Sequence, residues 1–290
     1  MVLIMHCFFV SDLHGSHGRY TQLFQYVQKK KPDAVFIGGD LLNLKMNSDG
    51  DTNQFIETDL FKNIKRIRRQ TAKEIRFFII LGNDDPRVYE HLFQEADDEH
   101  IIEYIHQKTV SFEDLFVTGY SYVPPTPFQL KDWERYDVSK YVDVGSTPLE
   151  DGFRTVDTDK DIVSDQTIAQ DIMELSKNAP VYRTIFLFHS PPYDTLLDIA
   201  DINGRMVDHV PLDVHIGSIA LKRFIINKQP FLTLHGHAHE STRLSGHWKQ
   251  RFGKTFSFNA AHDGASLSVI HFDTTSLLDA YRSILPVDLG

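Results

Sequence analysis

Short apolar runs alternate with segments of helical periodicity through the first half of the chain. The runs ending at Val10, Ile37 and Leu81 are almost continuously apolar, which is typical of strands buried on both faces of a sheet. Between them, residues 20–30 and 54–69 place apolar and charged side chains on opposite faces of a helix. This alternation predicts an α/β fold in which helices pack against a sheet.

The second half of the chain predicts a second sheet. Residues 184–188 and 231–234 are apolar runs, and each follows a segment of helical periodicity. Two further runs, at 255–258 and 267–272, are predicted to be antiparallel strands that close the second sheet. The pattern as a whole predicts two packed, mixed sheets with helices on their outer sides.

A stretch without clear periodicity interrupts this pattern at about residues 121–161. It begins with Pro124, Pro125 and Pro127, and a loop of this length inside a compact domain is usually functional or disordered. Its aromatic residues favour a packed structure. We therefore expect one domain spanning residues 1–290 with an insertion at about 121–161.

The insertion carries cationic and aromatic side chains just after its prolines, namely Lys131, Trp133, Arg135 and Tyr136. One interpretation is a lid that holds a phosphate and stacks a base, in which Arg135 contacts the substrate. The other is a packed surface elaboration without a role in binding. The sequence leaves both open.

The charge balance limits the kinds of partner. The 290 residues include 30 Lys and Arg against 40 Asp and Glu, a formal net charge of -10. Binding to long nucleic acids rests on neutralising many phosphates, so nucleic acid is an unlikely partner for this chain. The densest basic stretch, at 62–69, is interpreted as a solvated helix face. We expect a small-molecule partner, and the oligomeric state stays open.

Cysteine content and the opening run bear on location. Cys7 is the only cysteine, so no intramolecular disulfide can form and nothing indicates an oxidising compartment. The apolar opening run lacks a basic region and a small-residue cleavage site, and it is too short to span a membrane. We expect a cytoplasmic protein with no membrane partner.

Polar blocks follow the predicted strands. In order, they are Asp12-x-His14, Gly39-Asp40-x-x-Asn43, Gly82-Asn83-Asp84-Asp85, His189 and His237-x-His239. Taken singly, such residues are ordinary helix caps and turns. Taken together, they place carboxylates, imidazoles and one amide at strand ends, a donor set that suits Mn²⁺, Fe, Zn²⁺ or Ni²⁺ better than Ca²⁺.

A pair of divalent ions bound by this set would suit a phosphate ester. Two such ions carry a charge of about +4, which Asp12, Asp40 and a bridging hydroxide reduce to about +1. Ions about 3.5–4 Å apart can generate hydroxide and stabilise the attacking and leaving oxygens of an in-line displacement. We expect two divalent transition-metal ions, with Mn²⁺ first and Fe, Zn²⁺ and Ni²⁺ as alternatives.

The blocks resemble those of the calcineurin-like metallophosphoesterase family. The matching segments are SDLHG at 11–15, GGDLLN at 38–43, LGNDD at 81–85, FHSPP at 188–192 and HGHAHES at 235–241. They follow the family's order and span most of the chain apart from the insertion. The resemblance implies a four-layer α/β/β/α sandwich and hydrolysis of a phosphate ester by a hydroxide that bridges two metals.

The resemblance also implies a role for each residue. Seven residues would bind metal: Asp12, His14 and His239 at the first site, Asn83, His189 and His237 at the second, and Asp40 as the bridge between them. Asn43 and Arg135 are the predicted contacts to the substrate.

Asp84 departs from the family pattern. Many members have a His directly after the Asn, where it contacts phosphate and can protonate the leaving group. An Asp beside two dications has its pKa lowered and stays ionised, so it is a poor general acid. Candidates to replace it are the loop histidines His17, His209, His215 and His262. Asp84 and His215 are the predicted catalytic residues, and we favour His215 as the acid because it directly precedes the helix leading to the last ligand block.

The leading interpretation is a metal-dependent phosphodiesterase that hydrolyses a small soluble phosphate ester, since some phosphodiesterases of the family also lack that His. A phosphomonoesterase or protein phosphatase is the nearest enzymatic alternative. A third interpretation is a non-catalytic scaffold of the same fold that binds protein partners. A decayed scaffold would be expected to lose ligands, whereas all seven are present here.

Overall fold

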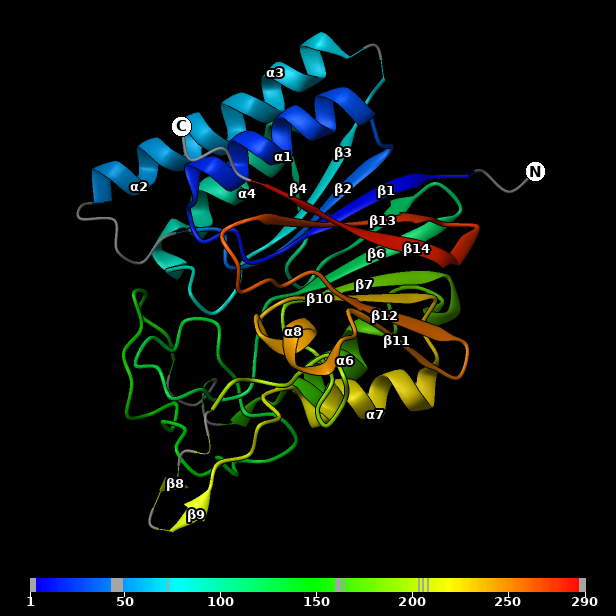
Figure 1. Ribbon diagram of the computed structural model, residues 1–290. Coiled ribbons are helices and arrows are strands. Elements are labelled where there is room, and N and C mark those ends of the chain that lie inside the picture. Colours follow the sequence, from blue (N-terminus) through cyan, green and yellow to red (C-terminus); the bar gives the residue numbers. More distant parts are fainter. Residues whose placement is uncertain are drawn as a thin grey trace.

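Two six-stranded sheets pack face to face in the computed structural model of the protein (Figure 1). The structure describes residues 4–42, 49–71, 73–159, 163, 165–202, 204, 206–207 and 209–286. The first sheet has the order β14 (Ser276–Leu285), β13 (Leu267–Asp273), β1 (His6–Val10), β2 (Ala34–Gly38), β3 (Arg76–Ile80) and β4 (Glu103–Tyr104). The second has the order β11 (Lys249–Phe252), β12 (Thr255–Asn259), β10 (Leu232–His235), β7 (Thr184–Phe188), β6 (Leu115–Tyr120) and β5 (Thr109–Phe112).

Helices cover the outer face of each sheet (Figure 1). Those beside the first sheet are α1 (His17–Lys30), α2 (Asp49–Phe55), a π-helical segment η1 (Ile56–Phe61), α3 (Lys62–Gln70), η2 (Arg87–Tyr89) and α4 (Glu90–Asp98). The second sheet is accompanied by α6 (Ile168–Leu175), η3 (Val181–Arg183), α7 (Ile219–Lys228) and α8 (Ser241–Ser245), and a small hairpin joins β8 (Met206–Val207) to β9 (Val210–Pro211). The predicted four-layer α/β/β/α sandwich of two mixed sheets is confirmed.

Alternate side chains of the central strands pack in two different hydrophobic cores. In β1, Phe8 and Val10 pack in the cluster that includes the helices beside the first sheet, whereas Cys7 and Phe9 pack between the two sheets. Successive side chains of a strand point to opposite faces, so a strand covered on both faces must be apolar at every position. This explains why the sequence shows continuous apolar runs. None of the described helices is long and apolar enough to cross a membrane.

One prediction about strand pairing is wrong. The run at 267–272 does not close the second sheet, because β13 pairs antiparallel with β1 in the first sheet, with His6 opposite Asp273. The run at 255–258 does lie in the second sheet, where β12 pairs antiparallel with β11 and parallel with β10. An apolar run indicates that a strand is buried, but it does not indicate which strand lies beside it. The sequence pattern therefore could not assign the neighbours of β12 and β13.

The described part of the insertion is packed against the domain although it contains no helix. Trp133 is fully buried, and its Nε1 donates to the backbone oxygen of Asp85 at 2.8 Å. Lys131 and Glu134 form an ion pair at 2.6 Å in which neither side chain is exposed. Asp137 accepts hydrogen bonds from Ser218 Oγ and the backbone of Ile219, so it helps to cap α7.

The buried ion pair predicts an asymmetric effect of substitution. Lys131→Met leaves a buried carboxylate without its cation, which costs about 3–5 kcal/mol of unfolding free energy. Lys131→Met combined with Glu134→Gln removes both charges and should recover most of that loss. Chemical denaturation followed by circular dichroism measures both variants. Equal destabilisation by the single and double changes would contradict this account of the pair.

Candidate metal centre

Strand ends bring the seven predicted ligands together. Asp12, Asp40 and Asn83 follow β1, β2 and β3, which are parallel neighbours in the first sheet. His189 follows β7, and His237 and His239 follow β10, its parallel neighbour in the second sheet. The carboxyl ends of parallel strands lie at one edge of a sheet, so the packing of the two sheets brings both sets of side chains to one place.

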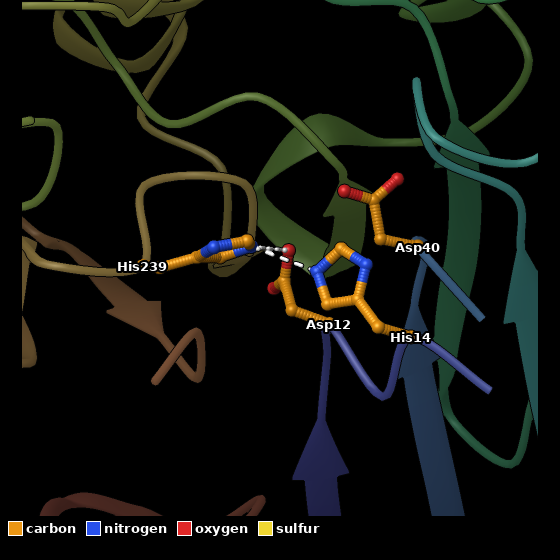
Figure 2. A group of neighbouring side chains, drawn as sticks. All are labelled: Asp12, His14, Asp40 and His239. Carbon is orange, nitrogen blue, oxygen red and sulfur yellow. Dashed lines mark hydrogen bonds and ion pairs between the residues drawn. The ribbon is translucent and has the colours of Figure 1, made fainter. Parts of the chain in front are cut away.

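The first cluster contains Asp12, His14, Asp40 and His239, whose potential ligand atoms all lie within 4.8 Å of one another. Figure 2 shows the imidazoles of His14 and His239 flanking the carboxylate of Asp12, with Asp40 beside His14. His239 Nε2 lies 3.0 Å from Asp12 Oδ1 and also 3.0 Å from His14 Nε2. Nitrogen and oxygen atoms that converge in this way suit a divalent cation.

The second cluster contains Asp40, His189 and His237, so Asp40 belongs to both. His189 Nδ1 lies 2.7 Å from the backbone oxygen of Gly38, which favours the proton on Nδ1 and leaves Nε2 toward the cluster. That Nε2 lies 3.3 Å from Asp40 Oδ2 and 3.0 Å from Asn83 Oδ1. The predicted bridging position of Asp40 agrees with its place in both clusters.

The backbone at the centre is left-handed at four of these residues. The φ angles are 59° at Asp12, 46° at His14, 52° at Asp40 and 68° at His237. Each such residue costs about 1–3 kcal/mol and persists only where its surroundings hold it. Backbone hydrogen bonds from Asp12 to Gly39 and from His14 to Asp40 hold the two loops together here. Four of the eleven non-glycine residues with positive φ in the described part of the chain are thus predicted ligands, which supports the hypothesis of a functional site here.

Gly82 forms the floor between the clusters. A Cβ atom at this position would lie 2.3 Å from Asp40 Oδ1 and 2.6 Å from His189 Nε2. Both distances are far shorter than any real contact, so only glycine leaves room for these two side chains.

Two supporting residues were not predicted from the sequence. Asp85 is fully buried and accepts three backbone N–H bonds, from Leu41 and Leu42 at Oδ1 and from Gly82 at Oδ2. Arg19 Nη1 donates to the backbone oxygen of Asp12 at 2.6 Å. Asp85 stood within the third polar block, but nothing in that block distinguished its role from that of Asp84.

The protein's own charges set the protonation of the histidines. Burial lowers the pKa of His239, but its hydrogen bond to Asp12 and the charge of Asp12 raise it to about 9. Burial likewise lowers the pKa of His189, and Asp40 raises it to about 10. Burial and the charge of His189 lower the pKa of His237 to about 3, which keeps that imidazole neutral and able to bind a cation.

Asp84 lies at the rim of the centre. Its Oδ1 accepts a hydrogen bond from Asn83 Nδ2 at 3.0 Å, its Oδ2 lies 3.7 Å from His14 Nδ1, and its backbone N–H donates to Asp40 Oδ1. Burial and the charge of Asp40 raise the pKa of Asp84 to about 7. Bound divalent cations would act in the opposite direction, so its ionised state in the loaded centre stays a prediction.

The other predicted site residues lie elsewhere. His215 faces carboxylates with both ring nitrogens, Asp198 at 2.9 Å and Asp194 at 3.7 Å. Arg135 pairs with Asp171 and stacks over Tyr122, and it lines a separate cavity of about 710 Å³ that none of the seven ligands lines.

The substrate-binding role of Arg135 and the catalytic role of His215 stay predictions, because the contacts of these two residues do not support either role. Asn43 falls outside the described residues, and its predicted role stays untested.

Comparisons with known proteins agree with the fold. The family model of calcineurin-like phosphoesterases matches residues 5–241. The solved structure of TT1561 from Thermus thermophilus is similar, with a TM-score of 0.57, 12% identity and coverage of 98% of this chain and 100% of that one. A dimetal phosphatase from Danio rerio is similar with a TM-score of 0.52, 9% identity and coverage of 97% and 99%. A comparison with curated proteins finds no match.

The two mixed sheets, with carboxylates and imidazoles gathered where their strands end, are the arrangement of a metallophosphoesterase, a hydrolase that acts on phosphoric ester bonds. The family model covers most of the chain, and the chain belongs to the calcineurin-like phosphoesterase family.

The contacts of Asp85 predict that it supports metal binding from a distance. In Asp85→Asn, the side-chain NH2 group must face at least one of the three backbone N–H groups that the carboxylate accepts from. Two donors cannot form a hydrogen bond, so we expect the loops carrying Asp40 and Asn83 to shift. We expect metal affinity to fall about 10–100-fold. Calorimetric titration of chelator-treated protein measures the change, with Asp279→Asn, an exposed carboxylate, as the control. Unchanged affinity in Asp85→Asn would contradict this role.

The raised pKa values of His189 and His239 predict proton release on metal binding. Both imidazoles are protonated at neutral pH before a cation binds, because their pKa values lie near 10 and 9. A metal ligand must be deprotonated, so binding at pH 7 should release about two protons and affinity should fall as the pH falls. Calorimetry in buffers of different ionisation enthalpy counts the protons, and binding without proton release is the contrary result.

Proposed function

We propose that the protein is a dinuclear-metal phosphodiesterase that acts on a small soluble phosphate ester. The observation that carries the proposal is the pair of ligand clusters that share Asp40. The donor atoms are nitrogens and oxygens in buried or half-buried positions, as expected for divalent transition metals, with Mn²⁺ first and Fe, Zn²⁺ and Ni²⁺ as alternatives.

Each cluster has a proposed role. Asp12, His14 and His239 hold the first metal, and Asn83, His189 and His237 hold the second, with Asp40 shared. Two ions bound there would supply positive charge to the phosphoryl oxygens and lower the pKa of a water molecule. The chain's own groups fix the imidazoles, as Gly38 does for His189.

The carboxylate of Asp84 supports a diester over a monoester. A phosphodiester carries one negative charge, whereas a monoester carries nearly two at neutral pH because its second pKa is about 6. An ionised Asp84 at the rim therefore repels the monoester about twice as strongly. A cytoplasmic location, in keeping with a buried thiol at Cys7, belongs to this proposal.

A substrate screen with an exchange at position 84 tests the proposal. With added Mn²⁺, the protein should hydrolyse bis-nitrophenyl phosphate faster than nitrophenyl phosphate. Asp84→His, which introduces the residue that many relatives carry, should raise the monoester rate relative to the diester rate, because a repelling charge is replaced by a donor.

Asp40→Asn serves as the matched inactive control, because it weakens both metal sites, and should lower turnover more than about 100-fold. Elemental analysis of each variant reports bound metal. Absence of turnover with Mn²⁺, Fe, Zn²⁺ or Ni²⁺ would overturn the enzymatic proposal and favour a scaffold, whereas preference for monoesters would overturn the diester assignment alone.

A further inference from the structure

A cavity of about 360 Å³ opens beside the first ligand cluster. Its lining includes the proposed ligands His14 and His239 together with Arg19, His262 and Asp263. His262 is thus a third imidazole in this cavity and has no proposed role as a ligand. Asp84, which holds the position of the family's histidine, does not line this cavity, but its Oδ2 lies 3.7 Å from Nδ1 of His14, which does.

The topology explains why His262 reaches this place. The strand β12 runs parallel to β10, with Asn259 opposite His235. Both strands therefore end at the same edge of the sheet, where β10 leads into the ligands His237 and His239. His262 follows Asn259 by three residues. The parallel pairing therefore places His262 at the same edge of the sheet as the proposed ligands His237 and His239.

The loop that carries His262 is fastened at several points. The backbone N–H of Ala260 donates to the backbone oxygen of His235 at 3.0 Å. Arg282 Nη2 donates to the backbone oxygen of Ala261, and Arg19 donates to the backbone oxygen of Gly264. Because Arg19 also donates to the backbone oxygen of Asp12, one guanidinium holds both the ligand loop and the loop of His262.

The imidazole of His262 is accessible and has no hydrogen-bond partner among the described residues. Its side chain is 23% exposed, and the nearest carboxylate oxygen, Oδ1 of Asp263, lies 3.8 Å from Nδ1, beyond hydrogen-bond distance. Asp263 instead accepts a hydrogen bond from Arg243 at 2.6 Å. His215 differs in this respect, because it is hydrogen-bonded to the buried Asp198.

Given the phosphoesterase function proposed above, on which this inference rests, we propose that His262 donates the proton to the leaving oxygen of the ester. Hydrolysis forms a bond from phosphorus to a water oxygen and breaks the bond from phosphorus to the leaving oxygen. The leaving oxygen keeps the electron pair of that bond and takes the proton of His262. The proton lost by the attacking water restores the imidazolium through solvent.

The pKa of His262 depends on the groups around it. In the free protein, burial and the charges of Arg282 and Arg19 outweigh the charge of Asp263, so the pKa of His262 is lowered. An anionic ester bound beside the ring would raise it. A proton donor is most effective when its pKa lies near the working pH.

Dependence on the leaving group tests the proposal. His262→Gln and His262→Asn place an amide nitrogen near the position of Nε2 or Nδ1, so either can donate a hydrogen bond, but neither can transfer a proton. Phosphodiesters with leaving alcohols of increasing pKa are hydrolysed by wild type, both variants, His215→Gln, and His247→Gln as an exposed control.

Both His262 variants should lose about 10²–10⁴-fold on poor leaving groups and less than about tenfold on nitrophenolate. The variants should retain wild-type metal content by elemental analysis. Equal losses on all leaving groups, full activity in either variant, or a selective loss in His215→Gln alone would overturn the assignment to His262. If wild type itself hydrolyses none of the esters, the proposed function fails first, and the two failures are thus distinguished.

Discussion

The candidate metal centre depends on the backbone turning sharply within two residues of a strand end. Asp12, Asp40 and His237 each lie two residues beyond the last residue of their strand, and each has a left-handed backbone. An extended continuation would carry these side chains away along the strand axis. The turns cost conformational energy, which the hydrogen bonds between the two loops and the packed sheets must offset. The site is therefore a product of the whole sandwich.

Hydrogen bonds around the predicted ligands connect their loops to the insertion. Asp85 holds the backbone on both sides of the centre, and its own backbone oxygen accepts from Trp133 of the insertion. The insertion therefore contacts the candidate metal centre through this hydrogen bond from the Trp133 side chain to the backbone of Asp85. Arg135 of the same insertion is paired with Asp171 and lines a separate cavity.

Part of the candidate site could be grouped by a physical rule. Polar residues directly after parallel strands of one sheet meet at one edge, so the sequence positions of Asp12, Asp40 and Asn83 are enough to group them. His189, His237 and His239 follow strands of the other sheet, and only the resemblance to the family joined them to this group. The pairing of β13 with β1 could not be predicted in this way, because an apolar run carries no label for its partner. The place of His262 could not be predicted for the same reason, since it follows from the parallel pairing of β12 with β10.

The role of Asp85 was hidden for a different reason. Two adjacent aspartates look alike in a sequence, and only the turn geometry decides that Asp84 points to the rim while Asp85 points into the protein.

Gly82 lies in the part of the candidate metal centre where no larger side chain can be accommodated. The carboxylate of Asp40 and the ring of His189 both occupy the space that a side chain at this position would need. Any substitution there would disturb both proposed metal sites at once, so position 82 offers no gradual route to a new activity. The rim residues Asp84 and His262 are under no such restriction. New substrate preferences on this scaffold should accordingly arise by exchange at the rim, while the floor stays fixed.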